Sequence, residues 1–208
     1  QVGVMLARFF LPPLDLNLEE ALALLLMTRK FVSRQVHPMY QHVLNAALKI
    51  ESNLPSGLLE HCGQCLDGIS APWPPSSPAD AVADVFPTIQ RALARRTRLK
   101  ARYDSVYDGG EIETVLEPLR LAFMARGWYV IAVSSAHGQA RTFKVDRMVS
   151  VVDTGETFTP NPAFSETRYF GAAWRMIPEG RVYPIKLRFS AAVAPSVEEV
   201  RWHEIQST

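Results

Sequence analysis

The residues of this chain that are best suited to chemistry lie between positions 127 and 147, in the stretch GWYVIAVSSAHGQARTFKVDR. Its aromatic and polar side chains include Trp128, Tyr129, Ser134, Ser135, His137, Arg141, Phe143 and Arg147. Alternation along a strand puts Arg141 and Phe143 on one face. A guanidinium beside an aromatic ring can pair with a phosphate while the ring stacks on a base. The stretch therefore predicts binding of a nucleotide or another anion rather than bond-making chemistry.

A structural role for the same residues stays open. Phe143 could belong to the core, and Arg141 could pair with a carboxylate such as Asp104. Trp128 and Tyr129 must point to opposite faces of their strand, so that one of them is mostly core. A buried tyrosine still needs a hydrogen-bond partner for its hydroxyl.

A second basic feature precedes this stretch. The cations Arg96, Arg98, Lys100 and Arg102 alternate with Thr97, Leu99, Ala101 and Tyr103, which predicts a half-buried strand with one basic face. Glu111, Glu113 and Glu117 follow the hairpin signal Asp108-Gly109-Gly110. The basic face either pairs with these carboxylates across the hairpin or takes a share in anion binding.

Composition gives an ordinary globular protein of 208 residues, 48% hydrophobic and 21% charged. The net charge of +1 is unevenly spread, because residues 95–150 hold 10 Lys/Arg against 6 Asp/Glu. A local basic excess suits an anionic partner. The apolar run 22–27 is too short to span a bilayer, and no signal peptide is recognisable. We therefore expect a cytoplasmic protein with no membrane partner.

Catalytic and metal motifs are weak. The sequence has no nucleophile elbow, no HExxH and no phosphate-binding glycine loop, so we expect no enzyme and no cofactor. Cys62 and Cys65 form a CxxC after His61, but a zinc site needs four ligands and no second pair follows. We expect no metal site, although a thiol or zinc sensor completed by another subunit remains a third hypothesis.

Periodicity sets out the elements. Helices are expected at about 17–33, 38–52 and 57–66, and a fourth helix after residue 80 that ends near Arg95. The prolines of 71–80 predict a linker. Strands are expected over 2–10, 97–103, 112–121, 127–134, 140–145, 148–152 and 181–190, a loop over 155–167 and a short helix over 195–201. The five central strands with tight turns suggest a small antiparallel barrel.

Four features in a fixed order resemble the WYL domain of bacterial transcriptional regulators. They are Tyr103 at a strand end, Pro118-Leu119, the run Trp128-Tyr129-Val130, and the stretch Arg141, Phe143, Asp146, Arg147. The run FFLPPLDLNLEEALALL at 9–25 is similar to the linker that follows the winged helix of these regulators. Residues 169–206 resemble the start of their C-terminal extension, and the chain looks like a piece of a longer protein.

The resemblance implies an α+β protein in which N-terminal helices precede a small five-stranded Sm- or SH3-like antiparallel barrel and a partial α+β extension. The expected regions are a helical linker and dimerisation region at 1–70, a proline-rich linker and helix at 71–94, the WYL barrel at 95–155 and the partial extension at 156–208.

The resemblance further implies the effector-sensing and dimerisation part of a helix-turn-helix regulator. It would bind a nucleotide or single-stranded nucleic acid, form a homodimer, and meet duplex DNA through a winged helix that this chain lacks. The expected ligand-binding residues are Tyr103, Ser105, Tyr129, Arg141, Phe143 and Arg147. Thr114 stands where the family usually has an arginine, which puts a standard anionic ligand in doubt. The alternative is a structural dimerisation module without ligand.

Overall fold

The computed structural model describes residues 15–31, 38–70, 82–124, 127–171, 173, 178, 183–203 and 206–207. The chain divides into two compact units, Gln1–Trp73 and Pro74–Thr208, and each is described by itself. The strand expected over 2–10 and the proline-rich linker expected at 71–80 lie outside the described residues.

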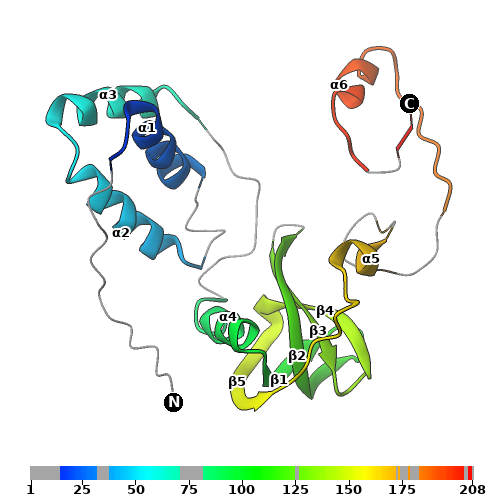
Figure 1. Ribbon diagram of the computed structural model, residues 1–208. Helices are drawn as coiled ribbons and strands as arrows, with labels where there is room; N and C mark the ends of the chain where they lie inside the picture. Colours follow the sequence, from blue (N-terminus) through cyan, green and yellow to red (C-terminus); the bar gives the residue numbers. More distant parts are fainter. Residues whose placement is uncertain are drawn as a thin grey trace. The chain divides into compact units, whose positions relative to one another are not determined.

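The first unit is helical, as expected (Figure 1). Helix α1 (Leu18–Leu26) continues into the π-helical turn η1 (Met27–Phe31), and α2 (Tyr40–Glu51) and α3 (Ser56–Asp67) follow. Asn17 begins α1 through a capping box, because its side chain accepts a hydrogen bond from the Glu20 amide while Glu20 accepts one from the Asn17 amide. The predicted helix starts are therefore right to within a few residues.

The core of the first unit is small. Leu25, Ala47 and Cys62 are buried together, one from each helix. Arg29 in η1 adds a bidentate ion pair to Glu51 at the end of α2, with Nε–Oε1 and Nη2–Oε2 distances of 2.9 and 2.6 Å. This fork geometry is the strongest arrangement for an arginine–carboxylate pair. Among the described residues, this small apolar contact and the Arg29–Glu51 salt bridge connect the helices.

The second unit contains the predicted sheet. Helix α4 (Phe86–Arg95) precedes strands β1 (Thr97–Ser105), β2 (Gly110–Met124), β3 (Gly127–Ser134), β4 (Gln139–Lys144) and β5 (Met148–Thr157). They form one antiparallel sheet in the order β4-β3-β2-β1-β5. The α+β fold class and all five central strands are confirmed. Strand β5 continues to Thr157, past its expected end at Val152, into the segment expected as loop.

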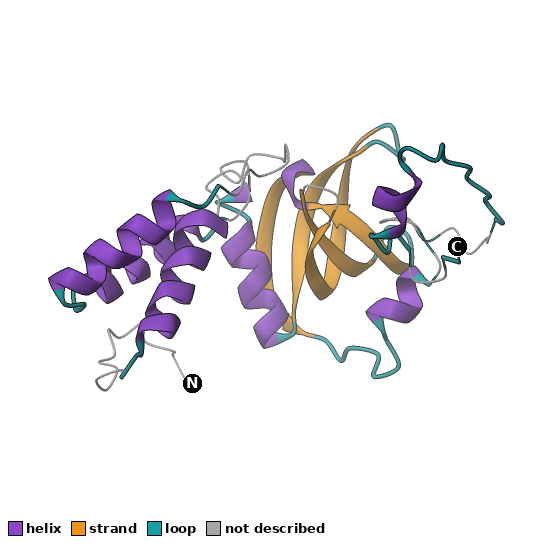
Figure 2. Cartoon of the chain, turned by 90° about the horizontal axis from the view of Figure 1, so that it is seen from above, coloured by secondary structure: helices purple, strands orange, loops and turns teal. Residues whose placement is uncertain are grey.

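Helix α4 covers one face of this sheet (Figure 2). It buries Phe86, Ile89 and Ala92 at helical spacing against sheet residues that include Leu99 and Leu116. Alternate residues of β1 are buried, from Thr97 to Ser105, so the pleat sends one row of side chains into this core. The inner face is therefore the face that α4 covers.

A closed barrel is not confirmed, because β4 and β5 are the two edges of the ladder and do not pair. The 3₁₀ helix η3 (Val145–Arg147) connects them. The Lys144 amide at the end of β4 donates to the Tyr103 hydroxyl, at an N–O distance of 3.2 Å. The hydroxyl of Tyr103, a side chain of β1, thus accepts the hydrogen bond of a backbone amide that a neighbouring strand would have accepted in a closed barrel.

Beyond the sheet the structure is less regular. Helices α5 (Glu166–Phe170) and α6 (Ala194–Glu198) are short, and α6 agrees with the expected helix at 195–201. The strand expected at 181–190 is wrong where it is described, since 183–190 has no strand assignment. Its apolar side chains, such as Ile185 and Leu187, are exposed. A strand needs a partner ladder, and no described residue pairs with this segment.

Candidate ligand-binding site

The structure places the predicted aromatic site residues in the core. Tyr103, Tyr129 and Phe143 are only 7%, 7% and 3% exposed. The rings of Tyr103 and Phe143 pack edge to face, with centroids 5.1 Å apart. These rings contribute buried apolar surface to the fold. Phe143 lies in the inner core of the sheet, where its structural interpretation expected it.

The strand register separates Tyr129 from the other predicted residues. Phe143 lies opposite Val130, and Tyr129 lies opposite Lys144. Tyr129 therefore faces away from the side of the sheet that carries Phe143 and Arg141. Burial raises the pKa of the Tyr129 hydroxyl above its ordinary value. Trp128 packs on the inner face against Phe86 of α4, at a centroid distance of 4.8 Å, which gives it a structural role.

Five polar side chains form a continuous hydrogen-bonded chain at the turns of two hairpins. We name them the hairpin cluster: Ser105, Asp108, Thr114, Ser134 and His137. Ser105 Oγ lies 2.5 Å from Asp108 Oδ2, which lies 3.5 Å from His137 Nε2. His137 Nδ1 lies 3.1 Å from Ser134 Oγ, which lies 2.8 Å from Thr114 Oγ1.

Local sequence explains why the two turns reach each other. The turn 106–109 closes with Gly109 at a φ of 77°, and the turn 135–138 closes with Gly138 at a φ of 66°, a region that glycine adopts without strain. The second turn folds back on β2, where the Ser135 amide donates to the Val115 carbonyl and the Val115 amide donates to Ser135 Oγ. The chain reversals thus bring β1, β2 and β3 side chains into one cluster.

Arg141 lies at the rim of the hairpin cluster. Its guanidinium carbon is 4.9 Å from the centre of the Tyr107 ring, a cation–π arrangement. Tyr107 itself is 80% exposed. The hydrogen bond from Ser105 lowers the pKa of the Asp108 carboxyl, and the nearby His137 and Arg141 lower it further. The cluster therefore presents an ionised carboxylate, a guanidinium and an exposed ring next to one another.

The predicted set is only partly brought together. Ser105 belongs to the hairpin cluster and Arg141 lies at its rim, whereas Tyr129 lies on the other face of the sheet. Arg147 is exposed in η3 and acts electrostatically on the Tyr129 hydroxyl rather than on Asp108. The pairing of Arg141 with Asp104, considered from sequence, is not among the described ion pairs.

Thr114, the departure from the family pattern, is a central member of the hairpin cluster. It is 4% exposed, and its hydroxyl contacts both Ser134 and Ser135, at oxygen distances of 2.8 and 3.3 Å. The Ala136 amide also donates to Thr114 Oγ1 at 3.4 Å. The position that would carry a cation in the family therefore holds the second hairpin turn in place.

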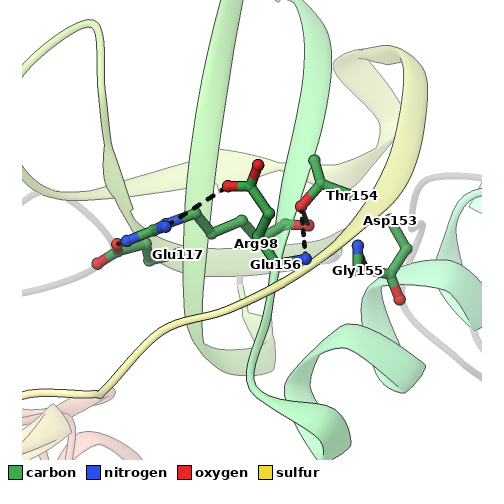
Figure 3. Close-up of polar contacts among 6 residues, drawn as sticks. All are labelled: Arg98, Glu117, Asp153, Thr154, Gly155 and Glu156. Atoms are coloured by element: carbon green, nitrogen blue, oxygen red, sulfur yellow. Dashed lines mark hydrogen bonds and ion pairs between the residues drawn. The ribbon is translucent and has the colours of Figure 1, made fainter.

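The basic row of β1 is occupied by carboxylates. Lys100 pairs with Glu113 at 3.5 Å and Arg102 with Glu111 at 2.5 Å. Figure 3 shows Arg98 reaching both Glu117 and Glu156, at 2.9 and 3.6 Å. Beside it, the Thr154 hydroxyl donates to the Arg98 carbonyl, which fixes the strand β5 against β1 (Figure 3). The cross-strand interpretation of this row is confirmed for these three cations.

Two other places are weaker candidates. A concave surface of about 500 Å³ lies between the outer face of the sheet and the segment around α5, with Glu117, Val133, Phe164, Arg168 and Tyr169 in its lining. None of the six predicted site residues lines it.

The cysteine pair lies on α3, where Cys65 Sγ is 3.7 Å from His61 Nε2 and Cys62 is buried. Within the described ranges, no three His, Cys, Asp or Glu side chains are grouped to hold a metal ion. None of the described helices is both long and apolar enough to cross a membrane.

Sequence reasoning missed Tyr107 altogether and gave no role to Asp108 beyond a turn. The sequence does show both turns, Asp108-Gly109-Gly110 and the polar turn after Ser134, but it does not show that the two turns meet. Two hairpin turns at the ends of paired strands can meet only through the curl of the sheet, which the sequence does not specify.

Comparisons with known proteins agree with the resemblance. Residues 84–152 match the family model of the WYL domain. Among solved structures, proteasome accessory factor B/C (PafBC) of Arthrobacter aurescens is 23% identical with a TM-score of 0.37, over 71% of this chain and 22% of that chain. A CRISPR Cas-related protein is 12% identical with a TM-score of 0.30, over 66% of this chain and 42% of that chain.

The chain thus spans less than half of either solved chain, and such TM-scores establish no shared overall fold. The family match, by contrast, covers α4, the first four strands and the first half of β5, and with them the whole hairpin cluster. Residues 84–152 of this chain are thus identified as a WYL domain.

Proposed function

We propose that residues 84–152 are the effector-sensing domain of a bacterial transcriptional regulator, and that the effector is a nucleotide or a single-stranded nucleic acid. The family match supports the regulatory assignment. The observation that carries the ligand assignment is Arg141, whose guanidinium lies over the exposed Tyr107 ring beside the hairpin cluster. Guanidinium and aromatic ring together bind phosphate and base.

Regulation would follow from a change in dimer arrangement. In this proposal the chain forms a homodimer, and a winged helix elsewhere in the protein contacts duplex DNA. An effector changes operator affinity only by as much as its own affinity differs between the two arrangements. The hairpin cluster joins β1, β2 and β3, so a ligand bound there acts on the strands rather than on a separate loop.

A catalytic role has less support. Ser134, His137 and Asp108 follow one another in hydrogen-bonded order, as a nucleophile, a base and an acid would. Ser134, however, is 0% exposed, so its hydroxyl cannot reach a substrate. The arrangement is better suited to holding two turns together than to attacking a bond.

The second candidate function is a structural dimerisation module without ligand. The exposed apolar side chains of α1 and η1, such as Leu24 and Met27 at 42% and 55%, favour it for the first unit. The effector-sensing domain and the structural module differ in whether the surface around Arg141 and Tyr107 binds a nucleotide or a single-stranded nucleic acid.

The test is a titration of the whole chain with nucleotides and short single strands of DNA and RNA. Arg141→Ala should weaken binding by roughly ten- to a hundredfold, because a charge-assisted contact contributes about 1.5–3 kcal/mol. The matched control is Arg91→Ala. Arg91 is an exposed arginine of α4 whose described hydrogen bond is to Thr88, so its loss should leave binding unchanged.

Equal binding by the wild-type protein and Arg141→Ala would contradict the assignment of this corner as the ligand site. Failure of the wild-type protein to bind any ligand of the set would favour the structural module.

A further inference from the structure

The Asp108 carboxylate is fixed in place at one of its two oxygens. Oδ2 accepts a hydrogen bond from Ser105 Oγ at 2.5 Å and lies 3.5 Å from His137 Nε2, while the Asp108 amide donates back to Ser105 Oγ at 3.1 Å. An ionised carboxylate has about four acceptor sites, two on each oxygen. None of the described hydrogen bonds or ion pairs uses Oδ1. The second oxygen is therefore held in position as an acceptor.

The neighbouring side chains define what would meet that acceptor. Tyr107 precedes Asp108 in the chain and is 80% exposed, and Arg141 lies 4.9 Å from the centre of its ring. Aromatic stacking accepts any base, because every base has a π face. Phosphate pairing by Arg141 likewise carries no base information. Of these three side chains, Asp108 is the acceptor that would favour a base carrying an amino group.

We propose that the corner formed by Tyr107, Asp108 and Arg141 prefers ligands whose base carries an exocyclic amino group, with Asp108 Oδ1 accepting a hydrogen bond from that group. The proposal rests on the proposed function, in that it takes this corner as the ligand site. Uracil and thymine have one ring N–H between two carbonyl oxygens, so their edge repels a carboxylate. Cytosine places an amino group where uracil has a carbonyl, and carboxylates accept from this group in nucleic-acid recognition.

Cytosine and uracil make the sharpest comparison, because both are single-ring pyrimidines with similar stacking surfaces. The experiment compares oligodeoxycytidine with oligodeoxyuridine of equal length, and CMP with UMP, by competition against a labelled strand on the whole chain. We expect the cytosine ligand to bind at least about tenfold more tightly, as one hydrogen bond to a charged group allows. Strand and mononucleotide arms show which of the two forms carries the affinity.

Three variants separate the roles. Asp108→Asn can turn either its donor or its acceptor to the base, so the preference should fall to about twofold while binding persists. Tyr107→Ala and Arg141→Ala should weaken cytosine and uracil ligands by equal factors. Circular dichroism checks that each variant folds. If Asp108→Asn does not fold, Ser105→Ala replaces it, because that change frees the carboxylate from its anchor and should also reduce the preference.

Equal affinity for cytosine and uracil ligands, with both weakened by Arg141→Ala, would overturn the base preference and leave the proposed function intact. A preference that Asp108→Asn leaves unchanged would overturn it too, since another group would then read the base. Absence of binding to all four ligands, and to the wider set of nucleotides, would overturn both.

Discussion

At the scale of single residues, this domain buries most of its predicted aromatic site residues and leaves the turn residue Tyr107 exposed. Tyr103 and Phe143 make the inner core, and the ring that remains exposed is Tyr107, on a turn. Loops carry functional residues because a rigid scaffold positions them without burying them. The hairpin cluster extends this division, since its buried hydroxyls hold the turns that present Tyr107 and Arg141.

Thr114 offers a direct test of the buried hydroxyls. Thr114→Val keeps the shape of the side chain but leaves Ser134 Oγ without its partner at 2.8 Å. The free energy of unfolding should fall by about 0.5–1.5 kcal/mol, the net contribution of one hydrogen bond, because Ser134 keeps its contact with His137. Denaturant unfolding measures this. Thr159→Val, at an exposed position, should cost far less, and equal losses in the two variants would contradict a special role for Thr114.

Asp108 predicts a pH dependence of stability. Its folded-state pKa lies below the ordinary 3.8, because Ser105, His137 and Arg141 favour the charged form. The contribution of the ionised Asp108 to stability is therefore complete above the ordinary pKa of 3.8, and it is lost as the pH falls through the lower folded-state pKa. The stability advantage of the wild-type protein over Asp108→Asn should shrink as the pH falls from about 5 to about 3. Asp84→Asn, at an exposed aspartate, serves as the control, and an advantage that grows in acid would refute the assignment.

At the scale of elements, paired strands neutralise charge that the sequence displays as a basic row. Arg98, Lys100 and Arg102 each pair with a glutamate of β2. The register puts Lys100 opposite Val115 and Arg102 opposite Glu113, so Lys100–Glu113 and Arg102–Glu111 are diagonal neighbours on one face of the strand pair. Successive side chains of β1 point alternately to this solvated row of ion pairs and to the inner core. Charge patterning along a strand thus says little about ligand binding until the neighbouring strand is known.

Lys100→Ala combined with Arg102→Ala should accordingly have small effects. Exposed ion pairs contribute about 0–1 kcal/mol each, so the unfolding free energy should fall by no more than about 2 kcal/mol. Affinity for an oligonucleotide should stay close to that of the wild-type protein, in contrast to Arg141→Ala. A loss of binding as large as that of Arg141→Ala would move the ligand site onto the basic face of β1.

At the scale of the whole molecule, the two units differ in how much apolar surface they bury. The sheet unit has a continuous core under α4, whereas the helical unit buries one small cluster and leaves Leu18, Leu24 and Met27 at least 38% exposed. Exposed apolar side chains on one helix are typical of an association surface. We therefore expect the chain to dimerise through α1.

The test changes that surface alone. Leu24→Asp combined with Met27→Asp should convert a dimer to a monomer in light scattering at tens of micromolar protein, because an interface tolerates buried unpaired charge poorly. Val152→Asp is a matched control on β5, where Val152 is 61% exposed. A wild-type protein that is already monomeric, or a dimer unaffected by the α1 changes, would contradict the prediction.

The sequence by itself determined the helices of the first unit, the helix α4 and the five central strands of this protein. The period of the apolar residues changes from helical to alternating near Arg95, and the structure begins β1 at Thr97. Glycine turns at Gly109 and Gly138 marked the hairpins, and the order of Tyr103, Trp128, Arg141 and Phe143 indicated the WYL family. These features are local, so short-range propensity and spacing are enough to specify them.

Only the tertiary structure decided which of the recognisable residues are exposed. Spacing put Arg141 and Phe143 on one face, but it could not say that Phe143 meets the Tyr103 ring while Arg141 reaches Tyr107. Nor could it show that Thr114, Ser134 and His137 close one hydrogen-bonded chain with Asp108. The register of β4 on β3 and the curl of the sheet set those distances, and both depend on contacts between residues far apart in the sequence.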